Sequence, residues 1–269
     1  MREADSKNET MEQTQSVQQY ITEKGNLMRN ISIVLANPKY ANNVGAVARC
    51  AKNMNIHSIK IVNGHTMEDG EINRTATHGA MDVVQSITSC RSVGEALQDF
   101  QFVVGATARK GSARGPAYTP REVAQEIINM ATNNKVALLF GSENKGLSND
   151  ELFFCHRIIN IPTSDTFTSI NLSHAVMIVC YEIFVANMNT TKQFSPKIAS
   201  VGETERMFEH MAQMFVKVGF LNKENPSYWM RHIRTFFART KILSKEVKIV
   251  RGILRQLEWY INSQQRTKE

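Results

Sequence analysis

Short apolar runs that end in polar, glycine-containing turns recur along this chain and constrain its fold more than any other feature. The clearest runs are Ile31–Leu35, Val136–Phe140 and Ile158–Ile161. Runs of this length, rich in branched residues, are typical of strands buried on both faces of a parallel sheet. Helical patterns alternate with the runs, so we predict an α/β fold with a mostly parallel sheet covered by helices.

The sequence predicts five strands and five helices in this region. The strands span 31–36, 57–62, 101–105, 136–140 and 157–161. The helices lie near 44–54, 92–99, 120–131, 147–153 and 171–188. Polar residues just beyond the carboxyl ends of such strands are where open α/β sheets bind ligands, so the turns after these strands predict one composite site.

Composition divides the chain into four segments. Residues 1–29 are polar and short of large apolar groups, and we expect a mostly disordered tail. Residues 30–188 carry the strand and helix alternation, and 189–201 lack periodicity and resemble a linker. Residues 202–262 predict a small all-helical domain, with a first helix ended by Gly219 and further helices near 227–239 and 244–262.

The net charge of +7 is confined to the C-terminal part of the chain. From Lys223 to Glu269 there are 11 Lys and Arg against 4 Glu, so the first 222 residues are neutral. A basic surface confined to one module is typical of a protein that binds a polyanion, most often nucleic acid. A solvated helix face would have the same composition, and charge alone leaves the two interpretations equal.

Neither a membrane nor a metal is expected. No apolar stretch approaches the length that crosses a bilayer and the first residues lack a signal pattern, so we expect a cytoplasmic protein. The scattered Cys50, Cys90, Cys155 and Cys180 form no CxxC pair, which favours free thiols over disulfides or a metal site.

The first turn contains Asn43-Val44-Gly45-Ala46-Val47-Ala48-Arg49. The Arg49 guanidinium offers donors suited to phosphate or carboxylate. Gly45 and Ala46 would keep the turn slim for a ligand. An N-capped helix with a surface arginine explains this motif equally well when it is taken alone.

The second turn, Gly141-Ser142-Glu143-Asn144-Lys145-Gly146-Leu147, has the glycine spacing of a Walker A loop without its Lys-Ser/Thr end. The segment Phe102–Arg109 likewise lacks G-x-G-x-x-G, so nucleotide triphosphates and dinucleotides are disfavoured. Glu143 could pair with Arg49 or cap the helix at Leu147, and an ordinary strand-to-helix turn is a strong alternative.

The third turn runs from Thr166 to His174, and its Ser169 and Asn171 can cap the following helix. A hydrolase using Ser169 and His174 lacks an acid at triad spacing. His156 and His174 lie among apolar residues, and we expect both to be buried structural histidines.

The three motifs in this order resemble the SPOUT class (TrmH/SpoU superfamily) of RNA 2′-O-ribose methyltransferases, closest to the TrmJ-type tRNA methyltransferases. The resemblance rests on N-x-G-x-x-x-R, G-x-E-x-x-G-L and I-P…S-x-N-L, and on Phe220, Asn225-Pro226 and Arg251-Gly252-Ile253-Leu254 in the helical module. This chain departs from the family at Asn42, where Gly is frequent, and at Ala106, where Thr or Ser is usual.

The resemblance implies a C-terminal trefoil knot in the sheet domain, a homodimer that completes the active site, and S-adenosyl-L-methionine as methyl donor with S-adenosyl-L-homocysteine as product. Its implied cofactor-binding residues are Ala106, Thr107, Ala108, Gly141, Ile161, Thr168, Ser169 and Ile170. Its implied catalytic residues are Arg49, assisted by Asn43, Glu143, Ser169 and Asn171.

The implied substrate is tRNA, at the ribose of cytidine or uridine 32 in the anticodon loop, gripped by the basic helical module. We expect the gripping residues to be Arg231, Arg234, Arg239, Lys241, Lys245, Lys248, Arg251 and Arg255. Two alternatives stay open at this point: a ribosomal RNA 2′-O-ribose methyltransferase and a catalytically inactive RNA-binding homologue.

Overall fold

The computed structural model describes residues 27–63, 69–109, 116–189, 195–221 and 226–266. Its strands all belong to one sheet. They are β1 Ile31–Ala36, β2 Ser58–Val62, β3 Thr88–Cys90, β4 Phe102–Ala106, β5 Ala117–Tyr118, β6 Val136–Phe140 and β7 Arg157–Ile159. Seven strands are paired in the order β3-β2-β1-β6-β4-β7-β5, and every pair is parallel, which confirms the predicted parallel α/β fold.

Helices surround the sheet and form the C-terminal unit. The helices before that unit are α2 Ala41–Asn53, α3 Asp69–Ala76, α4 Met81–Gln85, α5 Val93–Leu97, α6 Pro120–Ala131, α7 Asn149–Leu152 and α8 Leu172–Asn189, with a 3₁₀ turn at His78–Ala80. The C-terminal unit adds α9 Val201–Lys217, α10 Pro226–Thr240 and α11 Ser244–Arg266.

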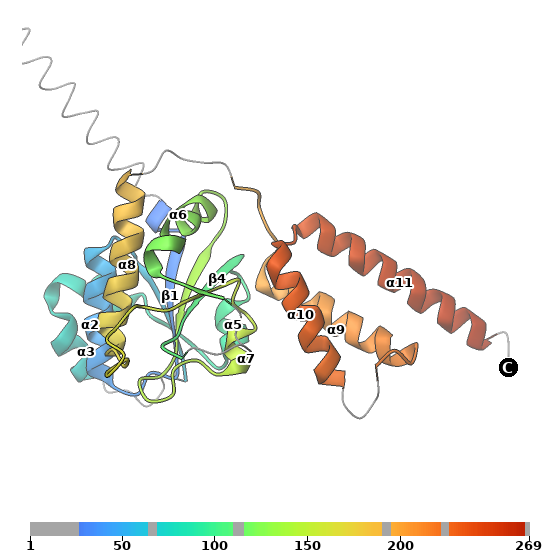
Figure 1. Ribbon diagram of the computed structural model, residues 1–269, viewed down its shortest axis with the longest axis horizontal. Helices are drawn as coiled ribbons and strands as arrows, with labels where there is room; N and C mark the ends of the chain where they lie inside the picture. The colour runs from blue at the N-terminus through green and yellow to red at the C-terminus, as the bar shows by residue number, and fades with distance from the viewer. Residues whose placement is uncertain (1–26, 64–68, 110–115, 190–194, 222–225, 267–269) are drawn as a thin grey trace, which may run out of the picture.

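Alternate side chains of the central strands enter two separate cores. In β1, Ile31 and Ile33 pack with helices α2, α6 and α8, whereas Val34 packs with α5 and α7 on the opposite face. Figure 1 shows α2 and α8 on one side of β1, with α5 and α7 on the other. Because successive side chains of a strand point to opposite faces, a continuous apolar run is what a sheet covered on both faces requires.

The helical unit has its own core. α9, α10 and α11 pack around Met207, Met214 and Leu254, which are all buried. This unit also contacts the sheet unit: the Val201 amide donates to the Phe100 carbonyl at 2.8 Å, and the Lys241 ammonium forms an ion pair with Glu126.

Two expectations about the ends and the short elements need correction. The predicted polar tail includes Leu27 and Met28, but their side chains are buried in the main core, because two consecutive apolar groups suffice to dock the chain before β1. The rest of the predicted tail lies outside the described residues. The sequence predicts none of the short elements β3, β5, α3 and α4, because few of their side chains are buried and they leave little apolar pattern.

Gly45 is expected to let a ligand approach, but it serves the packing of two helices. A Cβ at this position would lie 2.4 Å from the Ile72 carbonyl oxygen of α3. The helix itself begins at Ala41, three residues before its predicted start, so the motif of the first turn lies inside α2.

α8 is long and apolar enough to cross a membrane by length and composition, contrary to the expectation that no stretch would be. One face of α8 packs against the sheet unit with the buried side chains of Val176, Val179 and Ile183. Core helices of globular proteins can have the same length and apolar composition, so these properties are weak evidence for a membrane span.

Candidate active site

A cavity opens at the carboxyl ends of β4, β6 and β7, where the parallel sheet is expected to hold a ligand. Its volume is about 200 Å³. All eight residues expected to bind the methyl donor line it: Ala106, Thr107, Ala108, Gly141, Ile161, Thr168, Ser169 and Ile170. The fold therefore brings together three segments that are far apart in the sequence.

The wall between β6 and α7 is a tight loop that needs its glycines. The Gly146 amide donates to the Ser142 carbonyl at 2.7 Å and closes the loop on itself. A Cβ at Gly141 would lie 2.1 Å from the carbonyl carbon of Gly146, and Gly146 has a φ of 58°. Only glycine reaches such geometry at low cost, so the backbone comes close to the cavity.

Glu143 leaves this loop and caps α2. Its carboxylate accepts hydrogen bonds from the Lys39 amide at 2.8 Å, the Tyr40 amide at 3.4 Å and the Asn43 side-chain amide at 2.7 Å. Tyr40, at the N-cap of α2, provides no side-chain cap of its own. Glu143 therefore supplies the negative charge that a helix N-terminus favours. The carboxylate contacts neither of its predicted partners, Arg49 and the helix at Leu147.

The hydrogen bonds continue from Glu143 into the third motif. The Asn171 side-chain amide donates to the Asn43 side-chain oxygen at 3.0 Å, and Asn43 in turn donates to Glu143. The other end of Asn171 accepts from the Ser173 amide at 2.9 Å and so caps α8. Three predicted catalytic residues thus form one chain of hydrogen bonds.

A second cavity lies beside the first and shares Glu143, Ser169 and Ile170 with it. Its remaining lining residues are Tyr40, Asn43, Phe167, Asn171 and His174. Ser169 therefore lies where the two cavities meet. His174 is exposed at this opening, so the expectation that it is a buried structural histidine was wrong: it lies on the face of α8 opposite Leu172 and Val176.

Arg49 is the predicted catalytic residue that the single chain leaves outside both cavities. It lies on the exposed face of α2, and its side chain makes no hydrogen bond or ion pair with any residue in the described parts of the chain. Its guanidinium is therefore available to a second molecule.

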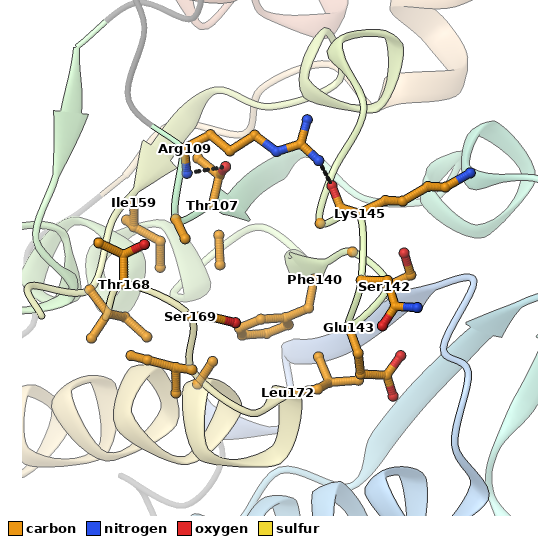
Figure 2. Close-up of a pocket in the computed structure, with 18 residues that line it drawn as sticks. Thr107, Arg109, Phe140, Ser142, Glu143, Lys145, Ile159, Thr168, Ser169 and Leu172 are labelled. Atoms are coloured by element: carbon orange, nitrogen blue, oxygen red, sulfur yellow. Dashed lines mark hydrogen bonds between the residues drawn. The ribbon is translucent and has the colours of Figure 1, made fainter. Parts of the chain in front are cut away.

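Arg109 and Lys145 line the cavity, although the predicted donor-binding residues of the β4 turn end at Ala108. The Arg109 guanidinium donates to the Lys145 carbonyl oxygen, and its amide donates to the Thr107 hydroxyl at 3.2 Å. Figure 2 shows Arg109 extended across the cavity to the facing loop. Its place directly after the β4 exit is the only signal in the sequence, and this signal is weak without the structure.

The predicted RNA-binding residues separate into two groups. Arg234 forms an ion pair with Glu205, Lys241 with Glu126, and the Arg231 guanidinium lies 5.2 Å from the centre of the Phe153 ring. The side chain of Arg239 lies outside the described residues. The other four, all on α11, are exposed: Lys245, Lys248, Arg251 and Arg255.

His156 is partly buried, and its contacts are structural, as predicted. Its Nδ1 accepts the Val103 amide at 3.1 Å, and its ring lies 5.3 Å from that of Phe102. Desolvation, aided by the nearby Arg157 and Lys241 charges, lowers the His156 pKa to about 4. Burial likewise raises the pKa of the Cys155 and Cys180 thiols, so both are inert.

All four cysteines are free, as expected, and the described residues contain no group of three or more potential metal ligands.

Comparison with known protein families identifies the class to which this fold and site belong. Residues 30–181 match the model of the SpoU rRNA Methylase family, and the chain belongs to that family. Residues 202–269 match the model described as tRNA methyltransferase TrmJ, C-terminal domain.

More particular relatives share both parts. The chain is 32% identical over 237 residues to the tRNA (cytidine/uridine-2′-O-)-methyltransferase TrmJ of Pectobacterium atrosepticum, covering 86% of this chain and 98% of that protein. It is 33% identical over 238 residues to the protein of the same name from Citrobacter koseri, with the same coverage. The crystal structure of TrmJ from Z. mobilis superposes with a TM-score of 0.74 at 28% identity, covering 84% of this chain and 98% of that one.

Proposed function

We propose that this protein is an S-adenosyl-L-methionine-dependent tRNA 2′-O-ribose methyltransferase that acts on cytidine or uridine 32 of the anticodon loop. The observation that carries the proposal is the joint lining of one cavity by all eight expected donor-binding residues. The Glu143–Asn43–Asn171 chain of hydrogen bonds lies at its edge. The relatives described above are named as tRNA methyltransferases, which supports tRNA as the substrate class.

The lining fits the proposed donor. Phe140, Ile161 and Leu172 offer apolar contact for an adenine ring, while the Gly141 loop exposes backbone groups close to the cavity. Arg109 and Glu143 contribute charges of both signs at the rim, which suits an amino acid tail. When bound, the sulfonium supplies a methyl group already activated by its positive charge.

The residues of the chain have to hold the ribose hydroxyl in line with the methyl group and the sulfur. We assign Arg49 to binding the target phosphate and orienting the hydroxyl, because a guanidinium holds its proton at neutral pH. Ser169 lies where the two cavities meet and would contact the nucleotide from the pocket side. Asn43, Glu143 and Asn171 position the two helix N-termini that border the second cavity.

We propose a homodimer in which Arg49 of each subunit completes the partner's site. Arg49 is exposed and is absent from the lining of its own cavity, as such an arrangement requires. The outward face of α8 adds support, because Ile178, Tyr181 and Met188 are 37%, 53% and 57% exposed on a helix whose opposite face is packed. Contiguous exposed apolar groups of this kind mark protein interfaces. The trefoil knot that the resemblance implies remains part of the proposal.

The helical unit would hold tRNA. Lys245, Lys248, Arg251 and Arg255 lie exposed on α11 and are the best candidates for binding phosphates. Arg234 is paired with Glu205 inside the helical unit, and Lys241 is paired with Glu126 of the sheet unit. Replacing any one of the four exposed cations by alanine should reduce the salt dependence of tRNA binding, because fewer counterions are then released from the RNA.

The test is methyl transfer from labelled donor to unmodified tRNAs, with the modified position mapped by nuclease digestion and mass spectrometry. We expect one methylated ribose at position 32. Methylation of ribosomal RNA alone would favour the ribosomal alternative, and donor binding without transfer to any RNA would favour an inactive homologue.

Subunit mixing tests the shared site. Arg49→Ala should lower turnover by about 100-fold or more, as loss of an orienting group does, while donor affinity stays unchanged. Mixing this variant with a Gly141→Ala variant should restore activity, because one mixed site then has an intact pocket and the arginine of the partner subunit. Absence of any restoration in confirmed mixed dimers would refute the shared site.

A further inference from the structure

The outer side of the helical unit carries an exposed group of rings that no part of the proposed site uses. We name Phe220, Tyr228, Trp229, His232 and Phe236 the aromatic patch. Four of its members are 58%, 56%, 52% and 64% exposed: Phe220, Tyr228, Trp229 and Phe236. Large rings left in water this way are costly unless a partner covers them, so the patch indicates a binding surface.

The aromatic patch and the buried residues of α10 lie on different sides of that helix. Met230 is buried in α10, and the Phe237 ring packs 5.7 Å from the Phe208 ring inside the helical unit. At 3.6 residues per turn, positions 228, 229, 232 and 236 fall together on the side away from Met230. α10 is therefore aromatic on both sides, and only one side packs into a core within the described residues.

Contacts between the rings hold the patch in shape. The Trp229 ring lies 6.2 Å from Phe220 and 5.7 Å from Tyr228, and the Tyr228 ring lies 5.0 Å from His232. Interplanar angles of 50°, 85° and 76° make these contacts tilted or edge-on. The rings support one another while about half or more of the surface of Phe220, Tyr228 and Trp229 faces solvent.

The charges around the patch favour an anionic partner. α10 contains neither Asp nor Glu, and His232 within the patch is exposed, whereas Arg234 is already paired with Glu205. Arg231 is exposed beside the patch, with its guanidinium over the Phe153 ring of the sheet unit. Aromatic rings interleaved with cations are what single-stranded nucleic acid needs, because bases stack on the rings while phosphates meet the cations.

We infer that the aromatic patch binds unpaired RNA bases, with Trp229 as the principal stacking residue. The inference rests on the proposed function, since it assigns the patch to the tRNA substrate. Unpaired bases suit it better than a duplex, whose base faces are already stacked and whose backbone would meet only the charges. The surface would give the helical unit a preference for RNA with an exposed loop, which phosphate binding by α11 cannot provide.

Tryptophan fluorescence tests this inference directly. The chain contains two tryptophans, Trp229 and Trp259. In full-length Trp259→Phe protein, the emission of Trp229 alone should be quenched by an unstructured oligoribonucleotide and by unmodified tRNA. A perfectly paired RNA duplex should bind with little quenching. Absence of quenching by every RNA that demonstrably binds would overturn the inference.

Substitution gives an independent readout. Trp229→Ala should weaken oligoribonucleotide binding by about 10-fold, the usual effect of losing one stacked base, with an unchanged salt slope. Trp229→Phe should retain most of the affinity. Leu257→Ala is the matched control, because Leu257 is 46% exposed on α11 but has no ring to stack, and the affinity of this variant should not change.

The outcomes separate the patch from the proposed function. If Trp229→Ala binds like the unsubstituted protein while tRNA is methylated normally, the patch inference fails and the function stands. If no RNA is methylated by the unsubstituted protein although quenching occurs, the function fails instead. Quenching that grows with protein concentration in the absence of RNA would mean that a second copy covers the patch, and would also overturn the inference.

Discussion

Removal of the Glu143 carboxylate should destabilise the sheet unit and loosen the edge of the site together. This carboxylate holds the Lys39 amide, the Tyr40 amide and the Asn43 side chain, at distances of 2.8, 3.4 and 2.7 Å. It reaches the N-terminus of α2 from a loop about a hundred residues later in the chain, so it joins two motifs that no local interaction connects.

The expected loss of unfolding free energy follows from those hydrogen bonds. Loss of a helix N-cap costs about 0.5–2 kcal/mol, and a charge near the N-terminus contributes about 0.3–1 kcal/mol. We expect Glu143→Ala to lower the free energy of unfolding by about 2 kcal/mol, which corresponds to a fall of about 4–8 °C in the melting temperature for a chain of this size. Glu143→Gln keeps one acceptor oxygen and should lose about half as much.

The assay is thermal and urea unfolding of both variants, followed by circular dichroism, with donor affinity measured in parallel. Lys145→Ala is the matched control, because it removes a charge from the same loop without touching α2. An unchanged melting temperature in Glu143→Ala would refute the capping role. A drop in activity with full stability would show instead that the carboxylate acts only in the reaction.

Three further predictions concern the pocket, the partly buried His156 and the outer face of α8. Gly141→Ala should weaken S-adenosyl-L-methionine binding by about 10-fold or more, because the added Cβ would lie 2.1–2.3 Å from backbone atoms. Isothermal titration calorimetry measures this affinity. Gly146→Ala should have the smaller effect, because a Cβ at Gly146 would have no atom within 4 Å. The pKa of His156 is lowered to about 4, so the unfolded chain binds the proton first and stability should fall by about 3 kcal/mol as the pH drops from about 6.5 to 4. His156→Gln should lack that part of the pH dependence in urea unfolding, and an identical slope in both proteins would contradict it. Tyr181→Asp should place a charge in the proposed dimer interface and yield an inactive monomer in light scattering, whereas an active dimer would exclude α8 from the interface.

Much of the fold can be predicted from local pattern. β6 and α6 have the bounds that the sequence predicts, because a five-residue apolar run and a helix that opens with Thr119 and Pro120 carry strong local signals. The helix after Gly141 is harder to place: Ser148 caps a four-residue α7, whereas the sequence predicts a longer helix there. Short elements depend on what packs against them, which no local pattern records.

Periodicity and charge were enough to predict the parallel sheet and the basic helical module, and the family resemblance carried by the three motifs implied the residues that line the cavity. The partners of those residues became known only from the folded chain, which pairs Glu143 with the N-terminus of α2 and leaves Arg49 on the surface. The same packing exposes His174 and assembles the aromatic patch on α10. Such pairings depend on how distant segments meet in space, and side-chain type alone cannot specify them.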